Sequence, residues 1–341
     1  MKKQSYIYKP NILKKLFIKL CRLLNYEIID QNNLYIPTAD KFASENLSIA
    51  GSKSINLPLG EVKITRPIKA LDIIIKTCTS VNLVSQSKRR IFEERKSDYT
   101  FKTINSIIKS VIFAQKNMPN VEFKISIIDH NSGNDDLETI KNKLNKSKIN
   151  NQIFSIDVGD FKNQIQKINE KNEEVTQNMQ ATMCSIYNSF LLSLKDEKDL
   201  VYFVEDDYIH KDDAITEMLF TYERLSSQLK RELVMCPTDY PFLYNKTDNT
   251  QIFLGNKKHW RTTRETLLTF LTSKKLIEKH WVLLENMCKL EHSPFEKPLH
   301  KMYETELCIS PMPSLALHCT NANSVFGLSP NLNWKELWEN N

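Results

Sequence analysis

The alternation of apolar and amphipathic stretches from residue 71 onward is the feature that most constrains the fold. Apolar runs typical of buried strands lie at 71–77, 123–129, 152–158 and 200–204. Between them, apolar residues at helical spacing lie at 98–116, 136–144 and 178–195. Apolar strands that alternate with helices are typical of a parallel sheet covered on both faces. The sequence therefore predicts an α/β fold with a mostly parallel sheet flanked by helices.

The second half of the chain is less regular. Its expected elements are a helix at 211–229, a strand at 232–236, a pair of strands at 251–255 and 266–272, a helix at 273–290 and a broken strand at 307–320.

The chain is expected to begin with an N-terminal segment, residues 1–66, that holds a helix and irregular chain with a small hairpin. A domain of residues 67–341 follows, and it divides into halves at residue 210.

Residues 11–24 are predicted to form an amphipathic helix. Apolar residues follow helical spacing on one side, and the other side is basic. Residues 1–24 hold seven basic residues and no acid, so removing these seven from the 47 basic residues leaves 40 against 41 acidic ones. The rest of the chain is thus not a nucleic-acid binder by charge. The helix suits either an anionic membrane surface or packing on the domain or on a partner chain.

Other features narrow the class of protein. No apolar run reaches the length of a membrane span, and the basic start lacks the apolar region of a signal peptide. The seven cysteines are scattered without a CxxC pair. These features predict a cytoplasmic protein with neither a disulfide framework nor a zinc site. With only six glycines and no glycine-rich phosphate loop, the chain needs another way to hold a phosphate.

Acidic residues fall where the predicted strands end. Asp129 ends one strand, Asp157 lies near the end of another, and Glu205, Asp206 and Asp207 follow a third. Ligands of parallel sheets bind at the carboxyl ends of the strands. Three adjacent carboxylates repel one another, and a divalent cation that also binds substrate phosphates would relieve that repulsion. The alternative is an acidic segment that favours the dipole of the helix after it.

Three stretches together resemble the glycosyltransferases of the GT-A fold, the family-two-like group in particular. The stretch "LDIIIKTCTS" resembles their opening strand, "ISIIDHNSGND" their second strand, and "LVYFVEDDYIH" their fourth strand with its acidic triplet. The resemblance covers about residues 70–330. It implies a Rossmann-like GT-A sheet, with a nucleotide-binding half at 67–210 and an acceptor half at 211–341.

The resemblance also implies roles for the strand-end residues. Thr77 and Asp129 would hold the nucleotide, although the family often has two acids where this chain has Asp129 and then a histidine. Asp207 would be the main ligand of Mn²⁺ or Mg²⁺. Glu205 and Asp206 would bridge to the ribose and to the metal.

Later residues complete the expected site. GT-A enzymes often supply a late histidine to the metal, and His318 ends the apolar run "SLALHCT". The alternative is a histidine satisfied in the core or at the surface. An inverting transferase also needs a carboxylate base, for which we favour Glu296, in a loop stiffened by two prolines, over Asp239. Arg261 is the candidate for the phosphates, because a guanidinium can bind them through two hydrogen bonds. The alternative for these charged residues is ordinary surface charge.

These features predict a metal-dependent, inverting glycosyltransferase that moves a sugar from a nucleotide-sugar donor to a glycan, lipid or protein acceptor. We expect it in the cytoplasm, peripheral on the inner face of a membrane if residues 11–24 bind lipid. Three other classes stay open, one of which is an envelope-associated scaffold that acts through the helix at 11–24. A nucleotidyltransferase or another metal-dependent phosphotransfer enzyme would act on a phosphodiester, and a non-catalytic protein would bind the sugar nucleotide without turnover.

Overall fold

The computed structural model describes residues 12–24, 26, 55–56, 60–61, 63–80, 91–195, 199–245, 249–320 and 324–341. It divides into two compact units. The first, residues 1–47 and 55–61, holds helix α1 (Ile12–Leu23) and the short antiparallel strands β1 (Ile55–Asn56) and β2 (Gly60–Glu61). The predicted helix is present as α1, and its residues Ile12, Leu13, Leu16, Phe17, Leu20 and Leu23 are exposed.

The second unit, residues 48–54 and 62–341, is built on a sheet that has nine strands in the described part of the chain. Their order is β5–β4–β3–β6–β11–β8–β12–β10–β9. The strands are β3 (Ala70–Thr77), β4 (Glu122–Asp129), β5 (Asn150–Ser155), β6 (Leu200–Glu205), β8 (Leu233–Met235), β9 (Ile252–Leu254), β10 (His259–Thr262), β11 (Phe270–Ser273) and β12 (Leu307–Met312). Strands β5, β4, β3 and β6 pair in parallel, as do β8 and β12. Pairs that involve β9, β10 or β11 are antiparallel.

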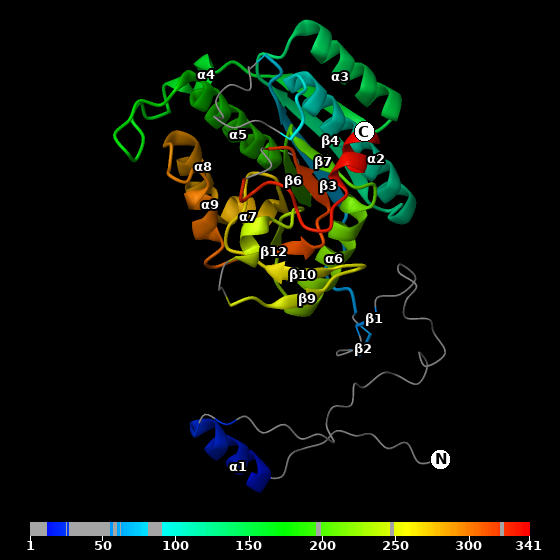
Figure 1. Cartoon of the computed structure of the whole chain (residues 1–341), viewed down its shortest axis with the longest axis vertical. Helices are drawn as coiled ribbons and strands as arrows, with labels where there is room; N and C mark the ends of the chain where they lie inside the picture. Colours follow the sequence, from blue (N-terminus) through cyan, green and yellow to red (C-terminus); the bar gives the residue numbers. More distant parts are fainter. Residues whose placement is uncertain are drawn as a thin grey trace. The chain divides into compact units, whose positions relative to one another are not determined.

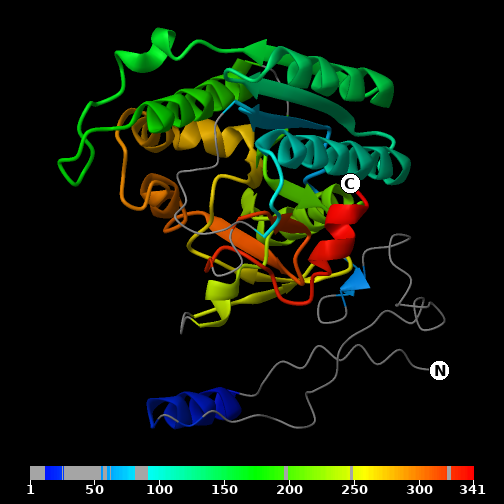
Figure 2. The same cartoon turned by 45° about the horizontal axis from the view of Figure 1, so that its top comes forward.

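Helices cover both faces of this sheet (Figure 1). One face carries α2 (Lys96–Asn117), α3 (Asn134–Ser147) and α6 (Ala214–Leu229). The other carries α4 (Gly159–Lys162), α5 (Gln177–Lys195), α7 (Lys274–Lys279), α8 (Trp281–Lys289) and α9 (Lys297–Met302). Successive side chains of a strand point to opposite faces, so Ile73 and Ile75 pack with α2 while Ile74 packs with α5. Figure 2 shows α2 and α3 side by side.

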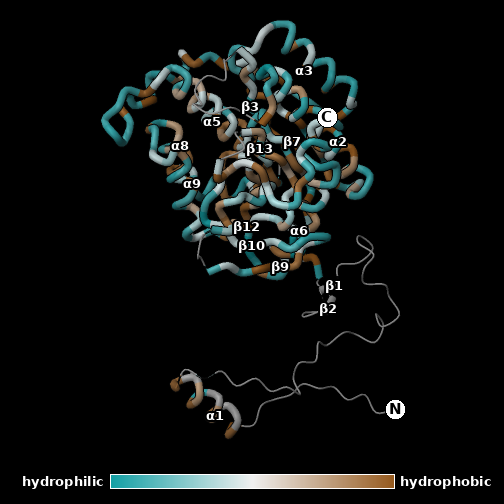
Figure 3. The backbone as a smooth tube through the Cα atoms, in the orientation of Figure 1, coloured by the Kyte–Doolittle hydropathy of each residue, from teal (hydrophilic) through white to brown (hydrophobic). Residues whose placement is uncertain are grey.

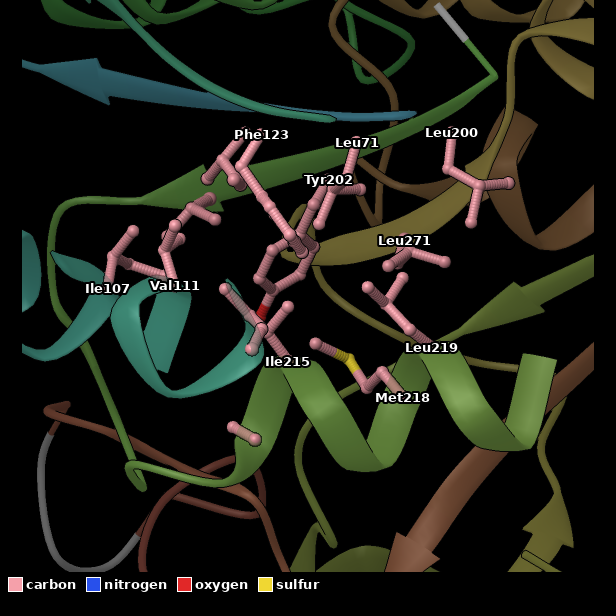
Figure 4. Packing of buried hydrophobic residues seen from close by; sticks show 14 of the residues in the cluster. Leu71, Ile107, Val111, Phe123, Leu200, Tyr202, Ile215, Met218, Leu219 and Leu271 are labelled. Carbon is pink, nitrogen blue, oxygen red and sulfur yellow. The ribbon is translucent and has the colours of Figure 1, made fainter. Parts of the chain in front are cut away.

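The strands are apolar at successive positions because both faces of the sheet are buried, one of them under α2 and α6. In Figure 4, side chains of both helices point toward the sheet. Those labelled are Ile107 and Val111 of α2, Ile215, Met218 and Leu219 of α6, and Leu71, Phe123, Leu200, Tyr202 and Leu271 of the strands. Full burial of a side chain of this size contributes about 1.5–3 kcal/mol. The exposed side of α3 is hydrophilic by contrast (Figure 3).

A second, small sheet follows the carboxyl end of β6. Strand β7 (Tyr208–His210) pairs antiparallel with β13 (Ala316–His318), which places His318 opposite Tyr208. Helix η4 (Pro241–Tyr244) lies after β8, and the last helix, α10 (Trp334–Glu339), packs on the start of α2. There the Trp338 ring stacks on Phe92 at 3.8 Å, and its carbonyl accepts a hydrogen bond from Lys102 Nζ at 2.7 Å.

The predicted α/β sheet flanked by helices is confirmed, and its parallel part is the β5–β4–β3–β6 half. The pairing of 251–255 with 266–272 was wrong. Strand β9 pairs with β10, and β11 instead inserts between β6 and β8. The helix expected at 273–290 is two helices that meet at His280. All seven cysteines are free, and no described helix is long and apolar enough to cross a membrane.

Candidate active site

The acidic triplet lies at the carboxyl end of β6, where the chain turns into β7. Glu205 is the last residue of β6, and its carboxylate pairs with Lys76 Nζ of β3 at 2.9 Å. Asp206 pairs with Lys96 Nζ at 2.5 Å. Asp207 Oδ2 lies 3.8 Å from Nε2 of His318. The repulsion that the sequence predicted is therefore relieved in part by two lysines, one from β3 and one from α2.

A cavity of about 290 Å³ lies beside these acids. It is bounded by the ends of β3, β4 and β6 and by the start of α5, which is the edge of the sheet where the sequence placed the ligand. Its walls are Lys76, Thr77, Cys78, Lys96, His130, Asn178, Ala181, Thr182, Ser185 and the three acids. The volume is close to the lower end of the range for small-molecule sites.

Asp206 anchors the turn of the triplet. Besides Lys96, its carboxylate accepts hydrogen bonds from the Thr100 hydroxyl at 2.9 Å and from the backbone N–H of Cys78 at 3.3 Å. Both carboxylate oxygens are thus engaged, and the side chain ties β3, β6 and α2 together. The role expected for Asp206 as a metal ligand has no support in this geometry, and we assign it to positioning.

Asp207 and His318 converge in a way that suits a metal ion. His318 Nδ1 lies 2.9 Å from the carbonyl oxygen of Phe326, to which it can donate its proton. That hydrogen bond would leave Nε2, the nitrogen nearer Asp207, as an acceptor. Metal-binding histidines commonly hold their other ring nitrogen in this manner. The ring also stacks on Tyr208 with centroids 4.5 Å apart, which fixes its plane.

These residues fit a divalent cation that the substrate helps to hold. One carboxylate and one imidazole are donors that Mn²⁺ accepts, and Mg²⁺ commonly takes one or two carboxylates together with substrate phosphates. Among the described residues, no group of three or more histidine, cysteine or acidic side chains is placed to bind a metal without a substrate. Asp207 and His318 would supply two of the ligands of such a cation and leave its other positions open.

Of the two residues expected at the nucleotide, Thr77 lines the cavity and Asp129 lies behind it. Thr77 lines the cavity, and its hydroxyl donates to Asp129 Oδ1 at 2.7 Å. Asp129 is buried and also accepts from the backbone N–H of Ser132. It does not itself line the cavity, whereas His130, the departure from the family pattern, does. Asp129 thus orients Thr77, and His130 lines the same cavity as Thr77.

Glu296 does not line the cavity of the triplet, but the pKa of its carboxyl responds to the charges of Glu205 and Lys76. It lies at the N-terminus of α9 and is partly buried. Burial raises the pKa of its carboxyl to about 7, and the nearby Glu205 carboxylate raises it while Lys76 lowers it. A group with such a pKa can take up a proton at neutral pH.

Asp239 and Arg261 lie elsewhere. The Arg261 guanidinium donates to the Asp239 carboxylate, and both side chains are buried. Arg261 lines a different cavity from that of the triplet, so its expected role at the donor phosphates has no support in the structure. Burial raises the pKa of the Asp239 carboxyl, although Tyr244 and Arg261 lower it, and hydrogen bonds from these two side chains occupy its two oxygens. Asp157 accepts a hydrogen bond from the Gly159 N–H at the start of α4 and lines a third cavity.

Sequence analysis missed the two lysines. Lys76 is a lone charge near the end of an apolar strand, and that interruption was a usable signal. Lys96 had none, because it is one of many lysines and its partner Asp206 is 110 residues away. The α5 residues Asn178, Thr182 and Ser185 also escaped, since small polar residues on a helix are common.

Comparison with known proteins adds a general likeness. No family model and no curated protein matches the chain. Among solved structures it is similar to S. aureus TarS 1–349, with 10% identity over 71% of this chain and 57% of that chain at a TM-score of 0.38. It is also similar to the galactosyltransferase LgtC, with 11% identity over 69% of this chain and 67% of that chain at a TM-score of 0.34. The likeness to mouse xyloside xylosyltransferase 1 has 10% identity over 69% of this chain and 76% of that chain at a TM-score of 0.36. The chain thus spans less than two thirds of TarS 1–349. At these TM-scores, the function proposed for this chain rests on its own residues.

Proposed function

We propose that this chain is a glycosyltransferase that moves a sugar from a nucleotide-diphosphate donor to an acceptor hydroxyl. The observation that carries the proposal is the convergence of Asp207 and His318, 3.8 Å apart, at the end of β6. Asp207 lines the same cavity as Lys76 and Thr77, and in this proposal that cavity holds the donor.

Asp207 and His318 would hold a divalent cation, Mn²⁺ or Mg²⁺, together with the donor diphosphate. When bound, the cation would supply positive charge to the departing diphosphate. Lys76 and Lys96 line the same cavity and add positive charge beside it. Through its hydrogen bonds Asp206 holds the turn of the triplet against the end of β3 and against α2.

Glu296 is the proposed base of an inverting reaction. Its carboxylate takes the proton of the acceptor hydroxyl as the acceptor oxygen bonds to the anomeric carbon. The bond between that carbon and the diphosphate oxygen breaks, and the nucleoside diphosphate leaves with the electron pair. Attack from the face opposite the leaving group inverts the anomeric carbon.

The test is the substitution Asp207→Asn, assayed as donor hydrolysis or transfer with a titration of Mn²⁺. We expect kcat/KM to fall about 100-fold or more, because charge stabilisation at a leaving group is worth that much, while circular dichroism and Tm stay close to wild type. Asp213→Asn, near the start of α6, is the matched control. Unchanged turnover in Asp207→Asn would refute the metal assignment, and donor binding without turnover in the wild type would identify a non-catalytic protein.

We also propose that α1 binds the surface of an anionic membrane, which would make the protein peripheral on the inner, cytoplasmic face. Ile12, Leu13, Leu16, Phe17, Leu20 and Leu23 are each at least 55% exposed. Brown segments mark the apolar residues of the helix in Figure 3. The seven basic residues of 1–24, with no acid, favour anionic lipid over an uncharged partner surface.

A further inference from the structure

The C-terminal segment, residues 324–341, meets the residues of the proposed metal site from two sides. Its helix α10 lies beside α2 in Figures 1 and 2. A helix of six residues is too short to be stable alone, so α10 depends on contacts with the rest of the fold. The proposed transfer gives this segment no role beyond that of one carbonyl oxygen, and the remaining contacts need an explanation of their own.

On one side, the C-terminal segment holds the imidazole of His318. The carbonyl oxygen of Phe326 lies 2.9 Å from His318 Nδ1 and accepts its proton. The Phe326 ring packs against two other aromatic rings, with centroids 5.3 Å from Tyr240 and 5.0 Å from Phe242. The backbone N–H of Phe242 also donates to the carbonyl oxygen of Val325 at 3.2 Å. The carbonyl that orients His318 is therefore fixed by the packing of its own residue.

On the other side, an apolar cluster supports the two strands beside the metal-binding residues. Successive residues of an extended chain point to opposite faces, so Leu317 and Cys319 point away from the face of His318. Both are wholly buried in one cluster with Ile209, which lies two residues after Asp207. The C-terminal segment completes this cluster with Leu328, Leu332, Trp334, Leu337 and Trp338. The same segment therefore packs against residues next to both expected metal ligands.

Trp338 attaches α10 to the start of α2. Its ring stacks on Phe92 with centroids 3.8 Å apart and meets Tyr99 edge-on at 5.0 Å. Tyr99 lies three residues after Lys96, the lysine that pairs with Asp206 at the donor cavity. One aromatic side chain therefore ties α10 to the part of α2 that borders the proposed site.

We infer that the C-terminal segment positions His318 for the cation, with Phe326 and Trp338 as positioning residues. The inference rests on the proposed function, because it assigns these residues a role at the metal site of that reaction. An imidazole that is free to rotate presents Nε2 toward Asp207 for only part of the time, so release of the segment weakens metal binding. Loss of a contact that orients a metal ligand typically lowers metal affinity by about 10- to 100-fold.

Mn²⁺ binding to the full chain, followed by water-proton relaxation, tests the inference. The titrations are made with UDP, GDP and dTDP in turn, because the base of the donor is not assigned. We expect the half-saturating Mn²⁺ concentration to rise about tenfold or more in Trp338→Ala and in Phe326→Ala, toward its value in His318→Ala. Trp338→Phe keeps a ring that can stack on Phe92 and should bind Mn²⁺ nearly as the wild type does.

Trp281→Ala is the matched control, because it removes a partly buried tryptophan from α8, where the ring lies 6.2 Å from that of Tyr187. It should lower the Tm and leave Mn²⁺ binding unchanged. Wild-type Mn²⁺ binding in both Trp338→Ala and Phe326→Ala, or an equal loss in Trp281→Ala, would overturn the inference and leave the proposed function standing. Mn²⁺ binding that is unchanged in His318→Ala would overturn the metal assignment and the inference together. If Trp338→Ala does not fold, Phe326→Ala decides the question.

Discussion

At the scale of single residues, Glu296 gives the proposed reaction its pH dependence. Its pKa is about 7, so the carboxylate form that can accept a proton is lost as the pH falls below 7. We expect kcat/KM to decline on the acid side with an apparent pKa near 7. Glu296→Gln should remove that limb and lower kcat by about 10²- to 10⁴-fold. A pH profile from 5.5 to 9 measures both effects.

The control for this prediction is Glu304→Gln, which changes an exposed acid just beyond the end of α9. It should keep the wild-type profile. An acid limb that persists in Glu296→Gln would assign the base to another residue.

His210 makes a second residue-scale prediction, on stability. Burial lowers the pKa of its imidazole to about 3, and Nε2 lies 2.5 Å from the Tyr202 hydroxyl. Between about pH 6.5 and 3 the unfolded chain binds a proton here and the folded chain does not. The free energy of unfolding should therefore fall with decreasing pH, by up to about 1.4 kcal/mol per pH unit from this group.

Urea unfolding at pH 7.5, 6.5 and 5.5 measures that slope. His210→Gln should flatten it, whereas His259→Gln, at an exposed position on β10, should leave it unchanged. Equal slopes in the wild type and His210→Gln would show that His210 is not the source.

The expected site residues that the structure brings to one edge of the sheet are those whose position follows from strand order. Asp207 and Thr77 end adjacent parallel strands, so the topology alone brings them to one edge. Arg261 and Asp239 instead pair with each other, which joins β10 to the segment after β8. The order of these strands in the sheet cannot be predicted from any local sequence pattern. Glu296 was placed by its position in the chain, but its raised pKa depends on burial that only the fold supplies.

At the scale of elements, predictability follows the length and burial of each strand. Strands β3 and β4 have eight residues each and are almost wholly buried, so their apolar runs are unmistakable. Strand β11 has four residues, and its insertion antiparallel between β6 and β8 depends on contacts with both. The break between α7 and α8 lacks the glycine or proline that would have signalled it.

Helix α1 makes the element-scale prediction. We expect the full chain to float with vesicles of phosphatidylcholine and phosphatidylserine, and to do so less at high salt, because basic residues attract the anionic surface. Deletion of residues 1–24, or Leu16→Glu with Leu20→Glu, should abolish flotation and leave donor binding unchanged. Vesicles of phosphatidylcholine alone are the control. Equal flotation with and without residues 1–24 would refute the membrane proposal. Association of two copies of the chain through α1, in place of vesicle binding, would also refute it.

At the scale of the whole molecule, net charge is a poor guide to partners. The excess of +6 is smaller than the seven positive charges of residues 1–24, so the remainder carries about as many acids as bases. Within the second unit, acids and lysines meet at the carboxyl edge of the parallel strands. The specificity of the proposed donor site must therefore come from this local arrangement, and the nucleotide is to be found by a screen.

Ligand binding to the folded state supplies that screen, because it raises stability by an amount set by ligand concentration over the dissociation constant. At 100 times that constant the gain is about 2.7 kcal/mol, which corresponds to a rise in Tm of about 5 °C for a domain of this size. We expect one of the UDP-, GDP- or dTDP-sugars to produce such a rise in the presence of Mn²⁺ and a smaller one in EDTA. Because Asp207 and His318 would share the cation with the diphosphate, either Asp207→Asn or His318→Ala should remove the difference between Mn²⁺ and EDTA. Each variant should keep the smaller rise in Tm that the donor produces in EDTA. A donor that stabilises the wild type equally with and without Mn²⁺ would leave the fold of a transferase with a donor site held by Lys76 and Lys96 and no metal.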